Sequence, residues 1–137
     1  MKSNQKGFTL IELLAVIVIL AIIALIATPI VLSSINDSRK KAAEDSTYGV
    51  IEAVRAKYAE MMLESSSIGD NMKVQWNDGV GIVDGTSEKV EVNGTKPASG
   101  TIEVDSNGTI KVEKLVIGGY TCSGSDTITC SSSSNNE

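Results

Sequence analysis

The chain has 137 residues, with 17 acidic and 12 basic side chains, and its formal net charge is −5 at pH 7. This length indicates one folding domain, and the acidic balance excludes an electrostatic footprint for nucleic-acid binding over the whole chain. The chain contains no histidine, which excludes catalytic and zinc sites that need imidazole, and its two cysteines are too few for a four-thiolate metal site. We therefore expect no enzymatic activity, no metal, no cofactor and no direct nucleic-acid partner.

Residues 8–32 form one apolar segment, with no polar side chain between Leu13 and Ala27. A membrane-spanning helix needs about 20 predominantly apolar residues, and this segment is long enough. The main alternative is a secretory signal peptide, which is cut after small residues of the A-x-A type. A cut after Ala27 would place Leu25 at the third position upstream, which fits that pattern poorly. The segment therefore predicts a transmembrane helix.

A single carboxylate, Glu12, lies near the start of this apolar segment, directly after a short polar leader at residues 1–7. A charge inside a bilayer is costly and usually marks function. Glu12 lies four residues after Phe8, so the two residues share one face of a helix. A cut after Gly7 would give Phe8 a positive α-amine that Glu12 could neutralise, within the subunit or on a neighbour. Because an unpaired Glu12 would be penalised, such a pair would set the register of an assembly.

The run from Lys6 to Leu14, KGFTLIELL, and the apolar segment up to Pro29 resemble the class III signal of type IV prepilins and pseudopilins. The resemblance covers about the first quarter of the chain. It implies that a membrane prepilin peptidase cuts between Gly7 and Phe8 and methylates the new amine to N-methylphenylalanine. It also implies that Glu12 guides docking of the subunit into a growing filament.

Pro29 interrupts the apolar segment near its end. Proline cannot donate a hydrogen bond to the carbonyl of Leu25, and its ring kinks or breaks a helix. Thr28 is pushed toward extended geometry by the ring that follows it. We expect a kink in a free helix. The resemblance implies that residues 21–29 unwind so that the helices pack in a filament, whereas a simple kink without a role is the alternative.

Residues 35–64 predict an amphipathic helix, so that one nearly continuous helix runs from Phe8 to about Leu63. Its apolar stripe follows three- and four-residue spacing and contains Ala43, Thr47, Val50, Ile51, Val54, Tyr58, Met61 and Met62. We expect this stripe to carry the core of a small domain.

Arg39, Lys40 and Lys41 form a basic cluster just beyond the apolar segment. We expect a solvated face that pairs locally with Glu44 and Asp45. Contact with anionic lipid headgroups before assembly, or pairing across subunits after it, are the alternatives.

Short alternating strands are predicted after a helix end at residues 65–67. They cover residues 73–76, 80–83, 89–92, 101–104 and 109–112, with a last extension at 116–117. Turn signals separate them at 77–79, 93–94 and 105–108. We expect an antiparallel sheet packed on the helical stripe, which is an α+β fold. The resulting organisation is a leader at 1–7, a transmembrane or filament-core segment at 8–32, an amphipathic helix at 33–64 and a head at 65–137.

Two weak patterns in the head are assigned to turns. Asn93 and Asn107 each begin an N-G-T glycosylation sequon, but both fit hairpin turns better. Asp105, Asn107 and Thr109 alternate as in a calcium loop, but glycine stands fourth rather than sixth and the closing glutamate is absent. The metal prediction is therefore none.

Cys122 and Cys130 close a nine-residue loop near the C-terminus. Outside the cytosol this spacing indicates a disulfide, with two free thiols as the alternative. The resemblance favours the disulfide, since many pilins close a C-terminal loop in this way. Residues 131–137 are expected to form a mobile polar tail.

The function that the resemblance implies is structural: a major-pilin-like subunit of a type IV pilus that supports adhesion, motility or biofilm formation. The partners would be identical subunits in a helical filament, a prepilin peptidase, an assembly platform protein and its ATPase, and membrane lipid before assembly. The precursor would lie in the cytoplasmic membrane and the filament at the cell surface. A pseudopilin of a type II secretion or competence system is the first alternative, and a membrane-anchored enzyme or ligand-binding domain is the second.

Overall fold

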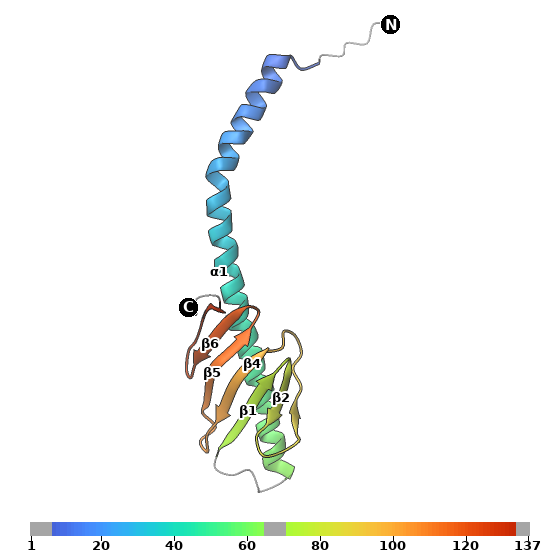
Figure 1. The fold of residues 1–137 in the computed structure, drawn as a ribbon, viewed down its shortest axis with the longest axis vertical. Coiled ribbons are helices and arrows are strands. Elements are labelled where there is room, and N and C mark those ends of the chain that lie inside the picture. Colours follow the sequence, from blue (N-terminus) through green and yellow to red (C-terminus); the bar gives the residue numbers. More distant parts are fainter. Residues whose placement is uncertain (1–6, 65–70, 134–137) are drawn as a thin grey trace, which may run out of the picture. The chain divides into compact units, whose positions relative to one another are not determined.

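The computed structural model of the chain describes residues 7–64 and 71–133 (Figure 1). Most of the predicted leader, the predicted helix end at residues 65–67 and the last four residues of the predicted tail lie outside this description. The chain divides into two compact units, residues 1–37 and residues 38–137. Each unit is considered by itself below.

One long helix, α1, runs from Leu10 to Glu64, and this confirms the predicted helix to within two residues at each end. Pro29 lies inside α1 without breaking it, and residues 21–29 are helical in the single chain. The extended geometry predicted for Thr28 is wrong. Proline removes only one hydrogen bond of the ladder, and the Thr28 hydroxyl makes a further bond by donating to the carbonyl of Ala24.

The first unit has an apolar surface that nothing in the described chain covers. Every leucine, isoleucine, valine and phenylalanine side chain from Phe8 to Leu32 is more than half exposed. By length and composition, α1 qualifies as a membrane-crossing helix near the N-terminus. Exposed apolar area on this scale marks a surface that meets lipid or other protein.

The second unit is a helix-on-sheet layer pair, in which the C-terminal part of α1 lies against one face of an antiparallel sheet (Figure 1). The seven strands are β1 (Met72–Asn77), β2 (Val80–Val83), β3 (Lys89–Val90), β4 (Ser99–Val104), β5 (Ile110–Ile117), β6 (Tyr120–Gly124) and β7 (Ile128–Ser132). Their order is β3-β2-β1-β4-β5-β6-β7, and every neighbouring pair is antiparallel. The predicted α+β fold is therefore confirmed.

The core lies between the helical stripe and the inner face of the sheet. The stripe contributes five buried side chains: Ala43, Thr47, Val50, Ile51 and Val54. Tyr58 and Met61 pack against them half-buried, but Met62 is 56% exposed, so its assignment to the stripe is wrong. Consecutive helical residues point about 100° apart, and of this pair only Met61 packs against the core.

Alternation within the strands selects the inner face, as the sequence predicts. The hairpin of β4 and β5 buries all four of its predicted inward residues, namely Ile102, Val104, Ile110 and Val112. In β1, Trp76 stands opposite Gly81 of β2 and its ring lies over the glycine, leaving no room for a side chain there. The indole Nε1 of Trp76 is buried and has no hydrogen-bond partner among the described residues.

The turns divide into two confirmed predictions and one correction. Asp78 and Gly79 connect β1 to β2 with φ angles of 48° and 82°, as a two-residue type I′ hairpin requires. In the loop between β4 and β5, the Asp105 carboxylate accepts hydrogen bonds from the N–H groups of Asn107 and Thr109, both at 2.9 Å. Asn93, by contrast, does not form a hairpin turn: it lies in the connection from β3 to β4, which are not neighbours in the sheet.

The C-terminal region holds two strands that the sequence analysis assigned to a loop and a tail. β6 and β7 pair antiparallel, and Cys122 and Cys130 stand directly opposite each other and form the predicted disulfide. Ser131 and Ser132 belong to β7, so the predicted mobile tail is wrong for these two residues. The sequence does not indicate these strands, because only Cys122, Ile128 and Cys130 are buried in them and most of their other residues are serine or threonine.

Gly100 should not tolerate a side chain, because it lies at a register shift and close to the backbone of the neighbouring strand. It lies between Ser99 and Thr101, where the pairing of β4 with β5 shifts, and its φ is +121°. A Cβ on Gly100 would stand 2.5 Å from the Leu115 Cα and 2.7 Å from the Lys114 carbonyl oxygen. We expect Gly100→Ala to lower the free energy of unfolding of the second unit by about 3 kcal/mol or more, measured by urea titration of the full chain in detergent.

Gly94→Ala is the matched control for this prediction. Gly94 also has a positive φ, +114°, but its Cβ would meet nothing within 4 Å. In this variant only the unfavourable backbone conformation should lower the free energy of unfolding, by about 1 kcal/mol. Equal losses in the two variants would contradict a steric role for the site at Gly100.

Candidate functional site

The N-terminal segment from Gly7 to Glu12 contains the residues that the sequence analysis singles out for processing and assembly. Gly7, Phe8 and Thr9 precede α1 and have no regular secondary structure. Phe8 is 81% exposed, and apart from the residues next to Gly7 in the chain, no atom of the described residues lies within 4 Å of the position that a Cβ on Gly7 would occupy. The peptide bond between Gly7 and Phe8 is therefore outside the helix and is not covered by any distant part of residues 7–64 or 71–133.

Thr9 caps the N-terminus of α1. Its hydroxyl oxygen accepts a hydrogen bond from the backbone N–H of Glu12 at 3.2 Å, and its carbonyl accepts one from Leu13 at 3.1 Å. Thr9 and Glu12 thus stand in the T-x-x-E spacing of a capping box, with Thr9 at the N-cap and Glu12 at the third helical position. The sequence analysis missed this role of Thr9, although the spacing was readable.

Glu12 therefore has a local role as well as any role in assembly. A carboxylate in the first turn interacts favourably with the partial positive charge at a helix N-terminus. Its side chain is exposed and forms no ion pair with any residue in 7–64 or 71–133. The carboxylate is consequently free to pair with a charge that another molecule supplies.

The other predicted site residues are not brought together with this segment. Pro29 lies further along α1 in the first unit, and Cys122 and Cys130 lie in the second unit. Within the part of the chain that the structure describes, no three or more His, Cys, Asp or Glu residues group closely enough to hold a metal ion.

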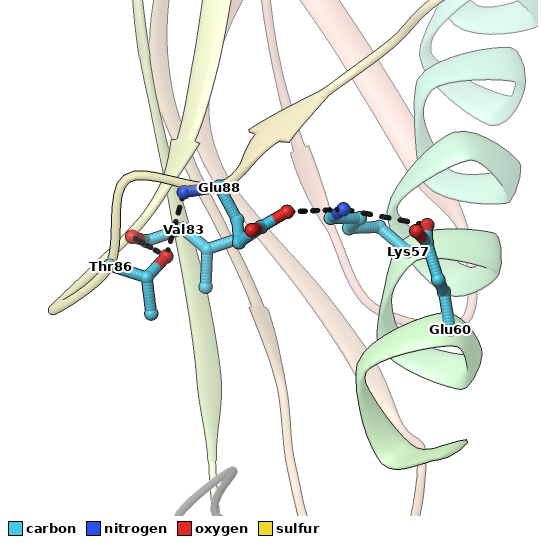
Figure 2. Close-up of polar contacts among 5 residues, drawn as sticks. All are labelled: Lys57, Glu60, Val83, Thr86 and Glu88. Atoms are coloured by element: carbon cyan, nitrogen blue, oxygen red, sulfur yellow. Dashed lines mark hydrogen bonds and ion pairs between the residues drawn. The ribbon is translucent and has the colours of Figure 1, made fainter. Parts of the chain in front are cut away.

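Lys57 joins α1 to the loop between β2 and β3, a contact that no sequence signal indicated (Figure 2). Its Nζ lies 2.7 Å from Glu88 Oε2 and 3.4 Å from Glu60 Oε2, and its side chain is only 12% exposed. The hydrogen bond to Glu88 is the main cause of the raised pKa of the Lys57 amine. Burial of the amine acts in the opposite direction, because it disfavours the charged form, but its effect is smaller.

The loop that carries Glu88 is itself held in place. The Thr86 hydroxyl donates to the Val83 carbonyl at 2.9 Å and accepts the backbone N–H of Glu88 at 3.1 Å (Figure 2). Glu88 is therefore presented to Lys57 by a preformed turn, which reduces the entropy lost in making the ion pair.

Tyr48 makes a second link between α1 and the sheet, at the opposite edge from β3. Its phenolic oxygen accepts the backbone N–H of Ile128, the first residue of β7, at 3.2 Å. The edge strand β7 is therefore attached to α1 by this hydrogen bond and to β6 by the disulfide.

The basic cluster at residues 39–41 behaves differently from its prediction. No ion pair joins Arg39, Lys40 or Lys41 to Glu44 or Asp45 among the described residues, so the expected local pairing is wrong. All three basic side chains are exposed. Ordering two long exposed side chains costs about as much free energy as an exposed ion pair returns.

A hollow of about 870 Å³ on the second unit opens where β4, β5 and β6 shift register. It is lined by backbone and short polar side chains with three charged residues, Lys111, Glu113 and Lys114. Lys111 and Glu113 pair with each other at 2.8 Å, which raises the pKa of the lysine amine and lowers that of the carboxyl. Both groups therefore stay charged near neutral pH, a state that suits a solvated face rather than proton transfer.

Comparison with known proteins gives a family match at the N-terminus and two relatives over most of the chain. The family model described as "Prokaryotic N-terminal methylation motif" matches residues 2–28. A "Fimbrial protein" of Dichelobacter nodosus is 36% identical over 111 residues, which cover 79% of this chain and just under two thirds, 65%, of the relative. A "Type IV major fimbrial protein FimA" of the same organism is 35% identical over 120 residues, or 82% and 68% of the two chains. No solved structure matches the chain.

The Lys57 contact should stabilise the second unit up to alkaline pH. A raised pKa means that the stabilisation is complete below the ordinary lysine value of 10.5 and is lost as the pH rises through the higher value in the folded state. We expect Lys57→Met, which keeps the apolar stem, to lower the free energy of unfolding by about 1 kcal/mol at pH 7. The difference from the unchanged chain should shrink above about pH 10.5.

Arg55→Met provides the control, because the ion pair of Arg55 with Glu52 is 3.7 Å long and both side chains are mostly exposed. Urea titrations of both variants at several pH values measure the effect. A loss for Arg55→Met as large as that for Lys57→Met would contradict a special role for Lys57.

Proposed function

The chain belongs to the type IV pilin family, and on that premise we propose that it is a structural subunit that assembles into a type IV pilus. The observation that carries this proposal is the exposed apolar surface of residues 8–32 on the first unit. In water this surface is unfavourable, since each fully buried leucine, isoleucine or valine gains on the order of 1.5–3 kcal/mol. The membrane covers it in the precursor, and the same segments of neighbouring subunits cover it in the filament.

Processing begins at the leader, residues 1–7. A prepilin peptidase hydrolyses the peptide bond between Gly7 and Phe8, and the new amine of Phe8 is methylated. The match to the methylation motif and the open, non-helical backbone at Gly7 and Phe8 support this step. The cut leaves a cationic amine one residue before the N-cap of α1.

Assembly then uses the carboxylate of Glu12. In the apolar filament core, the Phe8 amine of a neighbouring subunit neutralises Glu12, and the pairing sets the register because an unpaired charge there is penalised. Pro29 has no backbone N–H to donate, so α1 lacks one hydrogen bond at this point. Residues 21–29 therefore unwind at lower cost in free energy than the rest of the helix when the segments pack.

The remaining residues, 33–64 of the amphipathic helix and 65–137 of the head, form the filament surface. Cleavage removes Lys2 and Lys6, so the mature side chains carry 10 basic and 17 acidic charges, a net charge of −7. An acidic surface does not attract nucleic acid by charge. The role is structural rather than enzymatic and supports adhesion, motility or biofilm formation.

The precursor is a single-pass protein of the cytoplasmic membrane and the product is a surface filament. Its partners are identical subunits, the prepilin peptidase, an assembly platform protein and its ATPase. A pseudopilin would share the same signal and helix, but both relatives are named for fimbriae, which favours the pilus. Electron microscopy of sheared surface material with an antibody to the head distinguishes the two, because a pseudopilin gives no long surface filaments.

Substitutions at Glu12 should separate its charge from its role in the helix cap. Glu12→Val should leave membrane insertion intact and reduce the yield of sheared filaments by about tenfold or more, because the neighbouring amine loses its partner. Glu12→Gln keeps a capping-box side chain but no charge, and it should fail to the same extent. Thr9→Ala removes the cap and keeps the charge, so it should still assemble. Normal filament yield from Glu12→Gln would refute the charge pairing.

Processing should depend on the absence of a side chain at position 7. Gly7→Arg should block cleavage, because a long side chain would occupy the peptidase subsite next to the scissile bond. Mass spectrometry of the membrane fraction should then find the full-length chain, whereas the unchanged chain should yield a product that begins at methylated Phe8. A mature product from the Gly7→Arg variant would contradict the assigned cleavage site.

A further inference from the structure

The basic cluster Arg39, Lys40 and Lys41 is the longest run of positive charge in the chain and lies in the same helix as the apolar segment. Its three side chains are exposed and make no ion pair with any residue that the structure describes. We propose that this cluster binds the phosphate headgroups of anionic lipids while the chain is a membrane precursor. The inference rests on the membrane anchoring in the proposed function and adds a lipid preference to it.

The arrangement of the three residues favours a membrane surface over a protein partner. Consecutive residues of an α-helix point about 100° apart, so a partner on one side of α1 would contact one or two of them. Along the helix axis, however, the three lie within about 3 Å of one another. A layer that surrounds the helix, as headgroups do where a helix leaves the bilayer, contacts all three at once.

The position of the cluster in the sequence agrees with this layer. Arg39 follows Leu32, the last residue of the apolar segment, by seven residues, or about two turns of helix. Long lysine and arginine side chains extend along a helix and place their charges at the lipid interface. Each of the three charges can therefore reach a phosphate.

Arg39 also borders a hollow of about 350 Å³ on the second unit, together with Ser46, Thr95 and Gly118. The hollow offers room for a headgroup beside the guanidinium, which binds phosphate through two parallel hydrogen bonds, and two hydroxyl groups add further donors. This lining contains no carboxylate.

Three acidic residues flank the three basic ones, and none of them forms an ion pair with the cluster among the described residues. Asp37 precedes it, and Glu44 and Asp45 follow one to two turns further from the apolar segment. The rest of the acidic second unit is screened over about 8 Å at physiological ionic strength. Attraction to an anionic surface must therefore come from the local cluster, because the net charge of the chain opposes it.

The test uses the full-length precursor in phosphatidylcholine vesicles that contain spin-labelled lipid. Electron paramagnetic resonance measures the fraction of labelled lipid that the protein immobilises, for phosphatidylglycerol and for phosphatidylcholine. We expect about a threefold preference for phosphatidylglycerol, which falls toward one in about 1 M NaCl. The variant with Arg39→Gln, Lys40→Gln and Lys41→Gln should show no preference.

A matched control removes three exposed charges elsewhere in the second unit, through Lys89→Gln, Lys111→Gln and Lys114→Gln. It should keep the preference, because these residues belong to the sheet, with Lys89 in β3 and Lys111 and Lys114 in β5, and not to the helix that contains the apolar segment. Equal immobilisation of both lipids by the unchanged chain, or an undiminished preference in the 39–41 variant, would overturn this inference alone. Failure to immobilise either lipid would overturn the membrane anchoring and this inference with it.

Discussion

The constraint on which the rest of this protein depends is an apolar surface that its own chain does not cover. From Leu10 to Leu32, α1 carries large apolar side chains on every side, and all of its leucine, isoleucine and valine side chains are more than half exposed. A surface of this kind is stable only in contact with lipid or with apolar protein. In the proposed function, membrane anchoring and filament assembly are two solutions to this same physical problem, and the subunit exchanges one for the other.

The same helix meets a different environment in the second unit, and its sequence changes accordingly. There the apolar residues narrow to a stripe that begins at Ala43 and ends near Met61, and the sheet covers only this stripe. The links at the two edges of the sheet, from Lys57 to Glu88 and from Tyr48 to Ile128, attach polar groups of α1 to the loop that precedes β3 and to the first residue of β7. A core with few aromatic residues thus gains stability from its margins as well as from burial.

At the start of α1, two requirements converge on a few residues. The T-x-x-E spacing starts the helix through the hydroxyl of Thr9, and it also leaves the carboxylate of Glu12 without an ion pair among the described residues. Capping is satisfied within one chain, whereas in the proposed filament the Phe8 amine of a neighbouring subunit neutralises the carboxylate, because an unpaired charge in an apolar core is penalised. Substitutions that affect one requirement and not the other separate folding from assembly.

Local pattern was sufficient to predict α1 and the inward-facing residues of β4 and β5, because helical and strand periodicity record burial directly. The disulfide was predicted from the spacing of the two cysteines in the chain and from the family resemblance. The resemblance to prepilins and the lone carboxylate in the apolar segment singled out Gly7, Phe8 and Glu12 for processing and assembly, and these roles stay predictions. Strands β6 and β7, the place of Asn93 in a crossing connection and the contacts of Lys57 and Tyr48 were decided only by tertiary structure. The contacts of Lys57 and Tyr48 join residues far apart in the chain, so the pattern of one segment does not record them. Strands β6 and β7 are close in the chain, but most of their residues other than Cys122, Ile128 and Cys130 are serine or threonine, so they lack the apolar alternation that predicts a strand.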